Sequence, residues 1–153
     1  EEGTEMHKKA KELADKTYDF CKLFYELGGM SEEGDGKPIK VTYHDSCHLK
    51  RSLKVSKEQR ELLKHTKGVE FIEMNDCDNC CGFGGSYSLL YPEISAPILE
   101  KKIQNIKESG ADVVALDCPG CLMQIKGGLD ARGINDIKVK HTAEIIAEKR
   151  GLI

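Results

Sequence analysis

The chain has 153 residues, of which 39% are hydrophobic and 32% charged, and its net charge is −3. These values are typical of one globular domain with its own core, and the lack of a basic tract argues against binding to nucleic acid or to an anionic membrane surface. Its aliphatic runs are too short to span a bilayer, and no apolar segment of the secretory kind follows the charged start, so we expect a cytoplasmic protein.

The use of cysteine supports the same location. The seven cysteines are odd in number and sparse, which does not fit a secreted disulfide scaffold and favours metal binding or redox chemistry in a reducing compartment. The chain opens on Glu-Glu-Gly rather than on methionine, so we expect a fragment of a larger protein.

The N-terminal part is predicted to be helical. Residues 4–27 carry apolar side chains at intervals of three to five residues, which predicts an amphipathic helix that ends at Gly28-Gly29. Residues 31–38 are rich in turn formers and predict a loop. We therefore expect residues 1–37 to form a helix and linker packed on a single domain that spans residues 38–153.

In the main body, β-branched and aliphatic runs alternate with amphipathic segments. Alternation of strands and helices predicts a parallel sheet with right-handed crossovers. We expect an α/β, Rossmann-like fold with a four-stranded parallel sheet and flanking helices. The predicted strands are residues 39–43, 69–74, 112–117 and 137–141, and the predicted helices after them are residues 56–66, 97–109, 119–130 and 142–150.

Five of the seven cysteines follow these predicted strands at regular intervals. Thirty-two residues separate Cys47 from the adjacent pair Cys80 and Cys81, and 35 residues separate Gly82 from the CxxC element that begins at Cys118. A βαβ unit needs about 30 residues to return to the same end of the next parallel strand. We therefore expect all five thiols, including that of the second CxxC cysteine, Cys121, to meet at the carboxyl edge of the sheet, where open α/β folds bind ligands.

Five converging thiols favour an iron–sulfur cluster over a single zinc ion. Structural zinc takes four ligands, and adjacent side chains such as those of Cys80 and Cys81 point in opposite directions along extended backbone. A cluster offers several iron atoms to such a pair, and Gly82 lets the backbone approach it closely. Zinc bound by four of the five cysteines remains the alternative, and it would make the chain a structural or docking domain.

The cysteine pattern resembles a known family. Cys47, the run Cys80-Cys81-Gly82 and the element Cys118-Pro119-Gly120-Cys121 are similar to the cysteine-rich CCG domain of heterodisulfide reductases and of the iron–sulfur subunits of glycolate and lactate oxidases. The flanking segments 43–49, 110–114 and 141–146 are most similar to the C-terminal CCG domain of the latter. The resemblance covers residues 38–150.

The resemblance implies an oxidoreductase subunit with a non-cubane [4Fe-4S] cluster on the five cysteines. Such a domain passes electrons from a flavin-dependent 2-hydroxy-acid dehydrogenase subunit, of the glycolate or lactate type, to an acceptor. Disulfide reduction at the cluster, as in heterodisulfide reductases, is the alternative within this class. The implied partners are the flavoprotein subunit and further iron–sulfur domains of the parent protein, through which peripheral contact with a membrane is expected. A lone domain is not expected to be active, and air is expected to remove its cluster.

The remaining candidates are cysteines and histidines near these motifs. Cys21 lies on the apolar face of the first predicted helix, where a small buried hydrophobe is the simpler interpretation. Cys118 and Cys121 alone would also fit a thioredoxin-like redox pair, which the other three thiols argue against. Cys77, which forms a CxxC spacing with Cys80, and Gly82 are expected either to support the ligands or to have a structural role only. The histidines His44, His48 and His141 lie at predicted strand ends and are either supports or polar residues without that role; His48 is the main candidate for a support.

Overall fold

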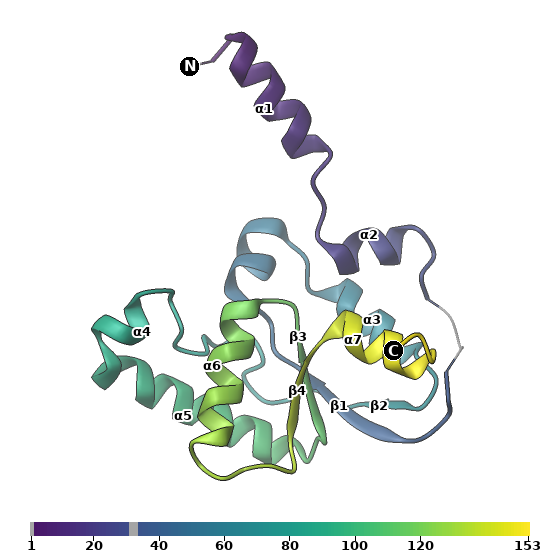
Figure 1. Ribbon diagram of the computed structural model, residues 1–153, viewed down its shortest axis with the longest axis vertical. Coiled ribbons are helices and arrows are strands. Elements are labelled where there is room, and N and C mark those ends of the chain that lie inside the picture. Colours follow the sequence, from purple (N-terminus) through teal and green to yellow (C-terminus); the bar gives the residue numbers. More distant parts are fainter. Residues whose placement is uncertain (1, 31–33) are drawn as a thin grey trace.

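The computed structural model of the protein describes residues 2–30 and 34–153. Its centre is a four-stranded sheet in the order β2-β1-β3-β4, in which all neighbouring strands are parallel (Figure 1). This arrangement confirms the predicted α/β fold. The strands are β1 (Ile39–Tyr43), β2 (Val69–Phe71), β3 (Val113–Leu116) and β4 (Lys138–His141).

Two layers of helices cover the sheet. Helices α5 and α6 contact each other on one side, while α3 and α7 contact each other on the opposite side (Figure 1). Within the described ranges, none of the helices is long and apolar enough to cross a membrane. The helices of the two layers are α3 (Lys57–Lys64), α5 (Pro92–Ser109), α6 (Pro119–Asp130) and α7 (Thr142–Lys149).

The structure differs from several of the predicted element bounds. Helix α5 starts at Pro92 instead of at residue 97, because Pro92 takes the first-turn position that suits proline and Pro97 lies inside the helix. Strand β2 ends at Phe71, earlier than predicted. Two short elements in the loops were not predicted, a π-helical turn η1 (Leu49–Leu53) and a helix α4 (Tyr87–Leu90).

The prediction of one helix over residues 4–27 is wrong. The structure has two helices, α1 (Glu5–Asp15) and α2 (Phe20–Glu26), because the Asp19 side chain accepts a hydrogen bond from the Lys22 N–H and starts a new helix. Helix α2 buries Cys21 against the main body, whereas α1 has no buried residue and stands away from it (Figure 1).

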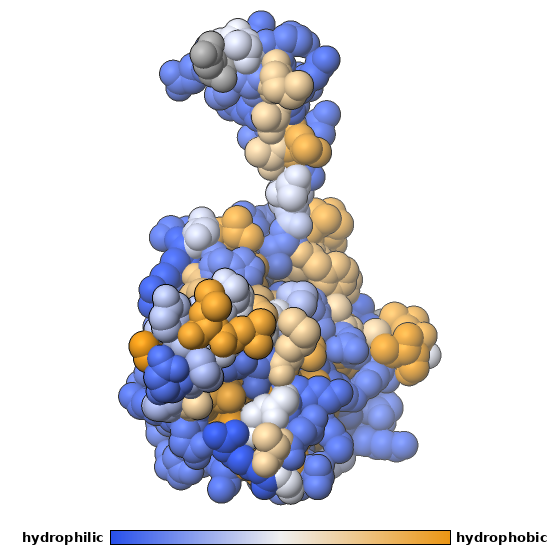
Figure 2. Space-filling model, turned by 60° about the vertical axis from the view of Figure 1, so that its left-hand side comes forward, coloured by the Kyte–Doolittle hydropathy of each residue, from blue (hydrophilic) through white to orange (hydrophobic). Residues whose placement is uncertain are grey.

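The core has one cluster on each face of the sheet. Val114 and Leu116 of β3 point toward α5 and α6, while Val113 and Ala115 point toward α3 and α7, so β3 is buried on both faces. The side of the molecule that carries α4 also exposes apolar side chains, which Figure 2 shows in orange; among them are Leu89, Leu90 and Ile94.

Candidate metal centre

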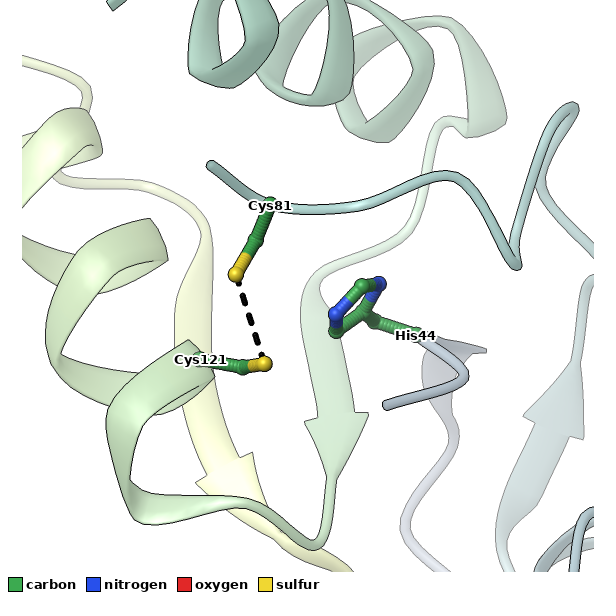
Figure 3. Close-up of side chains that lie close together, drawn as sticks. All are labelled: His44, Cys81 and Cys121. Carbon is green, nitrogen blue, oxygen red and sulfur yellow. Dashed lines mark hydrogen bonds between the residues drawn. The ribbon is translucent and has the colours of Figure 1, made fainter. Parts of the chain in front are cut away.

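Three buried side chains meet at the carboxyl edge of the sheet. His44 follows β1 directly, Cys81 lies in the loop after β2, and Cys121 lies in the first turn of α6 after β3. The ligand atoms of these three residues all lie within 4.8 Å of one another (Figure 3). The crossovers therefore bring together residues far apart in the sequence. Of the five cysteines whose spacing predicted a common site, this group holds Cys81 and Cys121.

The Cys81 and Cys121 sulfurs form the centre of this group. They lie 3.3 Å apart, too far for a disulfide bond and within hydrogen-bonding distance. The hydrogen bond with Cys121 holds the pKa of Cys81 well below that of an ordinary cysteine, against the effect of burial, and His44 lowers it further. The same hydrogen bond, together with burial, raises the pKa of Cys121. Cys81 is therefore the more acidic of two coupled thiols.

Two of the other three predicted ligands, Cys80 and Cys118, lie within electrostatic reach of this pair, and Cys47 lies within reach of Cys80. Partial burial raises the pKa of the Cys80 thiol, and the neighbouring Cys81 and Cys47 raise it further. Cys118 likewise contributes to the raised pKa of Cys121. Cys47 and Cys80 are exposed and Cys118 is half-buried, so the site runs from a buried floor to the surface. Mutual repulsion of this kind is relieved when thiolates bind a metal.

Gly82 fixes the turn that separates the two adjacent cysteines from α5. Its φ is +86°, and a Cβ there would lie 2.7 Å from the Ser95 carbonyl oxygen. The Gly82 N–H donates to the Cys80 sulfur at 3.3 Å, and the Ser95 hydroxyl donates to the Gly82 carbonyl at 2.7 Å. Glycine is therefore needed at this position for both its backbone conformation and its lack of a side chain.

A buried lysine lies under the loop that carries the cysteines. Lys102 of α5 is 1% exposed, and its ammonium donates to the carbonyl oxygens of Asp76 at 2.6 Å and Cys77 at 3.2 Å. Burial lowers the pKa of Lys102, and the anionic forms of Cys77 and Cys81 are the strongest influences that raise it again. A buried ammonium needs negative charge nearby, and the cysteine site provides it.

The Cys77 side chain points toward an ionic network. Its sulfur lies 3.4 Å from Arg60 Nη2 and 3.6 Å from Asp45 Oδ2. Arg60 donates to both oxygens of the buried Asp45 carboxylate, at 3.1 and 2.9 Å, and also to Glu73. The structure therefore places the Cys77 side chain with these charges, while its carbonyl faces Lys102.

Among the histidines, the structure brings His44 rather than His48 to the thiols. His48 is exposed, and in the part of the chain that the structure describes no hydrogen bond joins it to a cysteine. His141 caps α7 by accepting from the Ala143 N–H at 3.1 Å. The position of His44 directly after the buried strand β1 was the available signal in the sequence.

Cys21 lies outside the metal centre, as its apolar position predicted. It is fully buried between α2, α3 and α7, and its thiol donates to Asp117 Oδ1 at 3.6 Å. Burial, followed by the charge of Asp117, raises the pKa of this thiol. Cys21 therefore stays protonated and belongs to the core.

The donor atoms at the centre fit a metal. Two sulfurs and an imidazole nitrogen are ligands that zinc and iron accept, and the group can hold a metal ion. The His44 Nε2 atom is buried and, among the described residues, has no hydrogen-bond partner. A buried polar atom without a partner is costly, and a metal ion would satisfy it.

Comparison with known proteins identifies the family of the segment that carries these cysteines. Residues 41–126 match the family model described as "Cysteine-rich domain", named CCG. This match begins in β1, ends within α6, and contains all five cysteines of the predicted ligand set.

The chain is also similar to longer curated proteins. It is 42% identical over 139 residues to Lactate utilization protein A of Bacillus subtilis (strain 168), which covers 90% of this chain and 58% of that protein. It is 40% identical over 151 residues to Lactate utilization protein A 1 of Bacillus mycoides (strain KBAB4), with 98% and 61% covered. The chain thus spans about three-fifths of the length of these relatives. Its fold, its cysteine pattern and these matches show that it belongs to the cysteine-rich CCG domain family.

Proposed function

We propose that this chain is the iron–sulfur domain of an oxidoreductase that oxidises lactate or a related 2-hydroxy acid. The observation that carries the proposal is the pair of buried sulfurs of Cys81 and Cys121, 3.3 Å apart. Cys80 and Cys118 lie within electrostatic reach of this pair, and Cys47 lies within reach of Cys80. The proposed ligands of the cluster are Cys47, Cys80, Cys81, Cys118 and Cys121.

The residues of the site suit an iron–sulfur cluster in three ways. The buried floor formed by Cys81 and Cys121 excludes water from one side, and the exposed Cys47 and Cys80 leave the other side open to a partner. Cys121 lies in the first turn of α6, where the helix N-terminus would stabilise its thiolate once a metal had displaced the proton. Lys102 supplies positive charge beneath the loop. A bound cluster, a non-cubane [4Fe-4S] group in our proposal, would supply one-electron chemistry.

The substrate class and the partners come from the relatives. Those proteins are named for lactate utilization, and they are longer than this chain. We infer that residues 38–153 form one metal-binding domain of a larger cytoplasmic protein, and that a flavoprotein dehydrogenase subunit delivers electrons to it. Activity is expected only together with that subunit and the other iron–sulfur domains of the parent protein.

Anaerobic purification followed by metal analysis tests the cluster directly. The expected result is a brown protein with iron and acid-labile sulfide in nearly equal amounts. A colourless protein that holds one zinc ion and no sulfide would overturn the proposal and favour a structural zinc domain.

Electron transfer requires a second test. Reduced flavoprotein subunit, mixed with the cluster-loaded chain under argon, should bleach the visible absorbance of the cluster within the time of a turnover. Bleaching by dithionite but not by the reduced flavoprotein would argue against this electron donor. A change in the paramagnetic signal on addition of a disulfide substrate would instead favour disulfide reduction.

A further inference from the structure

We propose that the Nε2 atom of His44 is a nitrogen ligand of the metal group, in addition to the cysteines. This inference rests on the proposed metal centre but concerns a residue outside the cysteine pattern of the family. It begins with the hydrogen bonding of the imidazole ring. Its Nδ1 atom lies 3.2 Å from the carbonyl oxygen of Cys77.

This contact determines which ring nitrogen carries the proton. A carbonyl oxygen only accepts hydrogen bonds, so Nδ1 of His44 must be the donor. In the neutral imidazole the other nitrogen, Nε2, then has a free lone pair. The ring is thus in the tautomer that metal-binding histidines adopt when their second nitrogen donates to a backbone carbonyl.

The free lone pair of His44 Nε2 is buried. His44 is 1% exposed, and among residues 2–30 and 34–153 its Nε2 atom makes no hydrogen bond of ordinary geometry, although the ring is close enough to Cys81 to lower the pKa of that thiol. Water cannot satisfy this atom as it would on the surface, and leaving a buried polar atom unpaired is destabilising. A metal ion would remove that cost.

The two nearest thiols complete a set of three ligands. The donor atoms of His44, Cys81 and Cys121 lie within 4.8 Å of one another, and Figure 3 shows the three side chains around a common space. Tetrahedral ligands at about 2.0–2.3 Å from a metal are roughly 3.3–3.8 Å from each other. Two sulfurs at about 2.3 Å from a metal are about 3.8 Å apart. The present 3.3 Å between the sulfurs is therefore about half an ångström too short, and the two thiolates would separate by that amount on binding a metal.

The orientation of the ring is held from outside the site. The Cys77 carbonyl also accepts from the Asp45 N–H at 3.1 Å and from the Lys102 ammonium at 3.2 Å. It is therefore fixed by the segment that follows β1 and by α5, and it aims Nε2 of His44 at the thiols. An outer partner that fixes a ligand in this way is typical of metal sites.

Histidine labelled with ¹⁵N tests the ligand in the loaded protein. After anaerobic loading and reduction, pulsed electron paramagnetic resonance should detect a strongly coupled histidine nitrogen. The signal should vanish in His44→Asn, whose side-chain amide can still donate to the Cys77 carbonyl, and persist in the control His48→Asn. A loaded, reduced protein without this coupling, or a signal that survives in His44→Asn, overturns the inference while leaving the cluster proposal intact.

Titration of the metal-free protein with cobalt(II) provides a readout that needs no cluster. Loss of the nitrogen ligand in His44→Asn should weaken cobalt(II) binding by about tenfold or more and change the visible spectrum, whereas His48→Asn should match the parent chain. Circular dichroism checks that each variant is folded. Equal affinity and identical spectra for His44→Asn and the parent chain would overturn the inference, even if iron analysis had already failed.

Discussion

Cys81 and Cys21 are both buried beside the carboxyl ends of β1 and β3, yet their thiols differ in acidity. The first has a thiol and an imidazole as neighbours, which lower its pKa. The second contacts the Asp117 carboxylate, and burial and that negative charge raise its pKa. Burial alone therefore does not decide whether a cysteine is a ligand or a core residue; the charge of its neighbours does.

The pleat of the strands separates these two environments. Tyr43 and Asp117 point to the face covered by α3 and α7, where the Tyr43 hydroxyl donates to Asp117 at 2.9 Å. The next residues along the chain, His44 and Cys118, lie toward the other face, where His44 meets the Cys81 and Cys121 thiols. Because side chains alternate along a strand, residues that are neighbours in the sequence lie on opposite faces of the sheet. One face carries the Tyr43–Asp117 contact, and the other carries the candidate metal centre.

The largest expected difference is between variants of the metal-site cysteines, Cys81 and Cys121, and a variant of the core cysteine, Cys21. Cys81→Ser and Cys121→Ser should abolish iron loading, because each removes a central sulfur ligand. Cys21→Ala should keep the iron content of the parent chain and lower the free energy of unfolding by roughly 1–2 kcal/mol, because it removes a buried sulfur. Iron analysis and urea unfolding measure the two effects. Iron loss in folded Cys21→Ala would break the distinction.

Gly82→Ala tests the turn that positions the metal-binding face. The added Cβ would meet the Ser95 carbonyl at a φ that disfavours any side chain, so unfolding free energy should fall by roughly 2–4 kcal/mol, with loss of iron. Gly85→Ala is the matched control, because Gly85 has a φ of +65° but no atom within 4 Å of the added Cβ. Only the backbone cost of about 1–2 kcal/mol is expected there. Equal losses in the two variants would show that the contact with Ser95 has no effect.

The difference in acidity can be measured in the metal-free protein. Ordinary cysteines, with pKa values near 8.5, are mostly protonated at pH 7, so thiolate absorbance near 240 nm should come mainly from Cys81. Because its pKa is lowered, this absorbance should persist below pH 7 and disappear only on further acidification. Cys81→Ser should remove it at pH 7, whereas Cys21→Ala should leave it unchanged. Absorbance that appears only above pH 8 would contradict the assignment.

A smaller effect is expected from the buried ammonium. Lys102→Met removes a positive charge beneath the anionic site, so the reduction potential of the bound cluster should fall by on the order of 30–60 mV, a three- to tenfold change in the redox equilibrium. Lys101→Met is the neighbouring control, since Lys101 is exposed and pairs with Asp76 at the surface. Redox titration of both variants measures the difference, and equal potentials would exclude an electrostatic role for Lys102.

Much of this arrangement is predictable from the sequence because local patterns determine it. The β-branched runs placed all four strands, and the interval of one βαβ unit between the cysteines predicted that they meet at one edge. The position of β2 beside β1, rather than beside β3, depends on packing and was not predicted. His44 was weighed only as a strand-end residue, because its tautomer depends on a carbonyl 33 residues away. Asp19 broke the first helix through a cap that an apolar spacing does not reveal.

The Cys77 carbonyl, which accepts from the Asp45 N–H, from His44 and from Lys102, has a consequence for mutational tolerance. A backbone acceptor is present whatever side chain the residue carries, so position 77 can change without removing the contact that orients the imidazole. The chain can therefore vary this side chain, and with it the contact with Arg60, while keeping the geometry of the centre. Substitutions at position 77 are therefore expected to leave the orientation of the His44 ring unchanged.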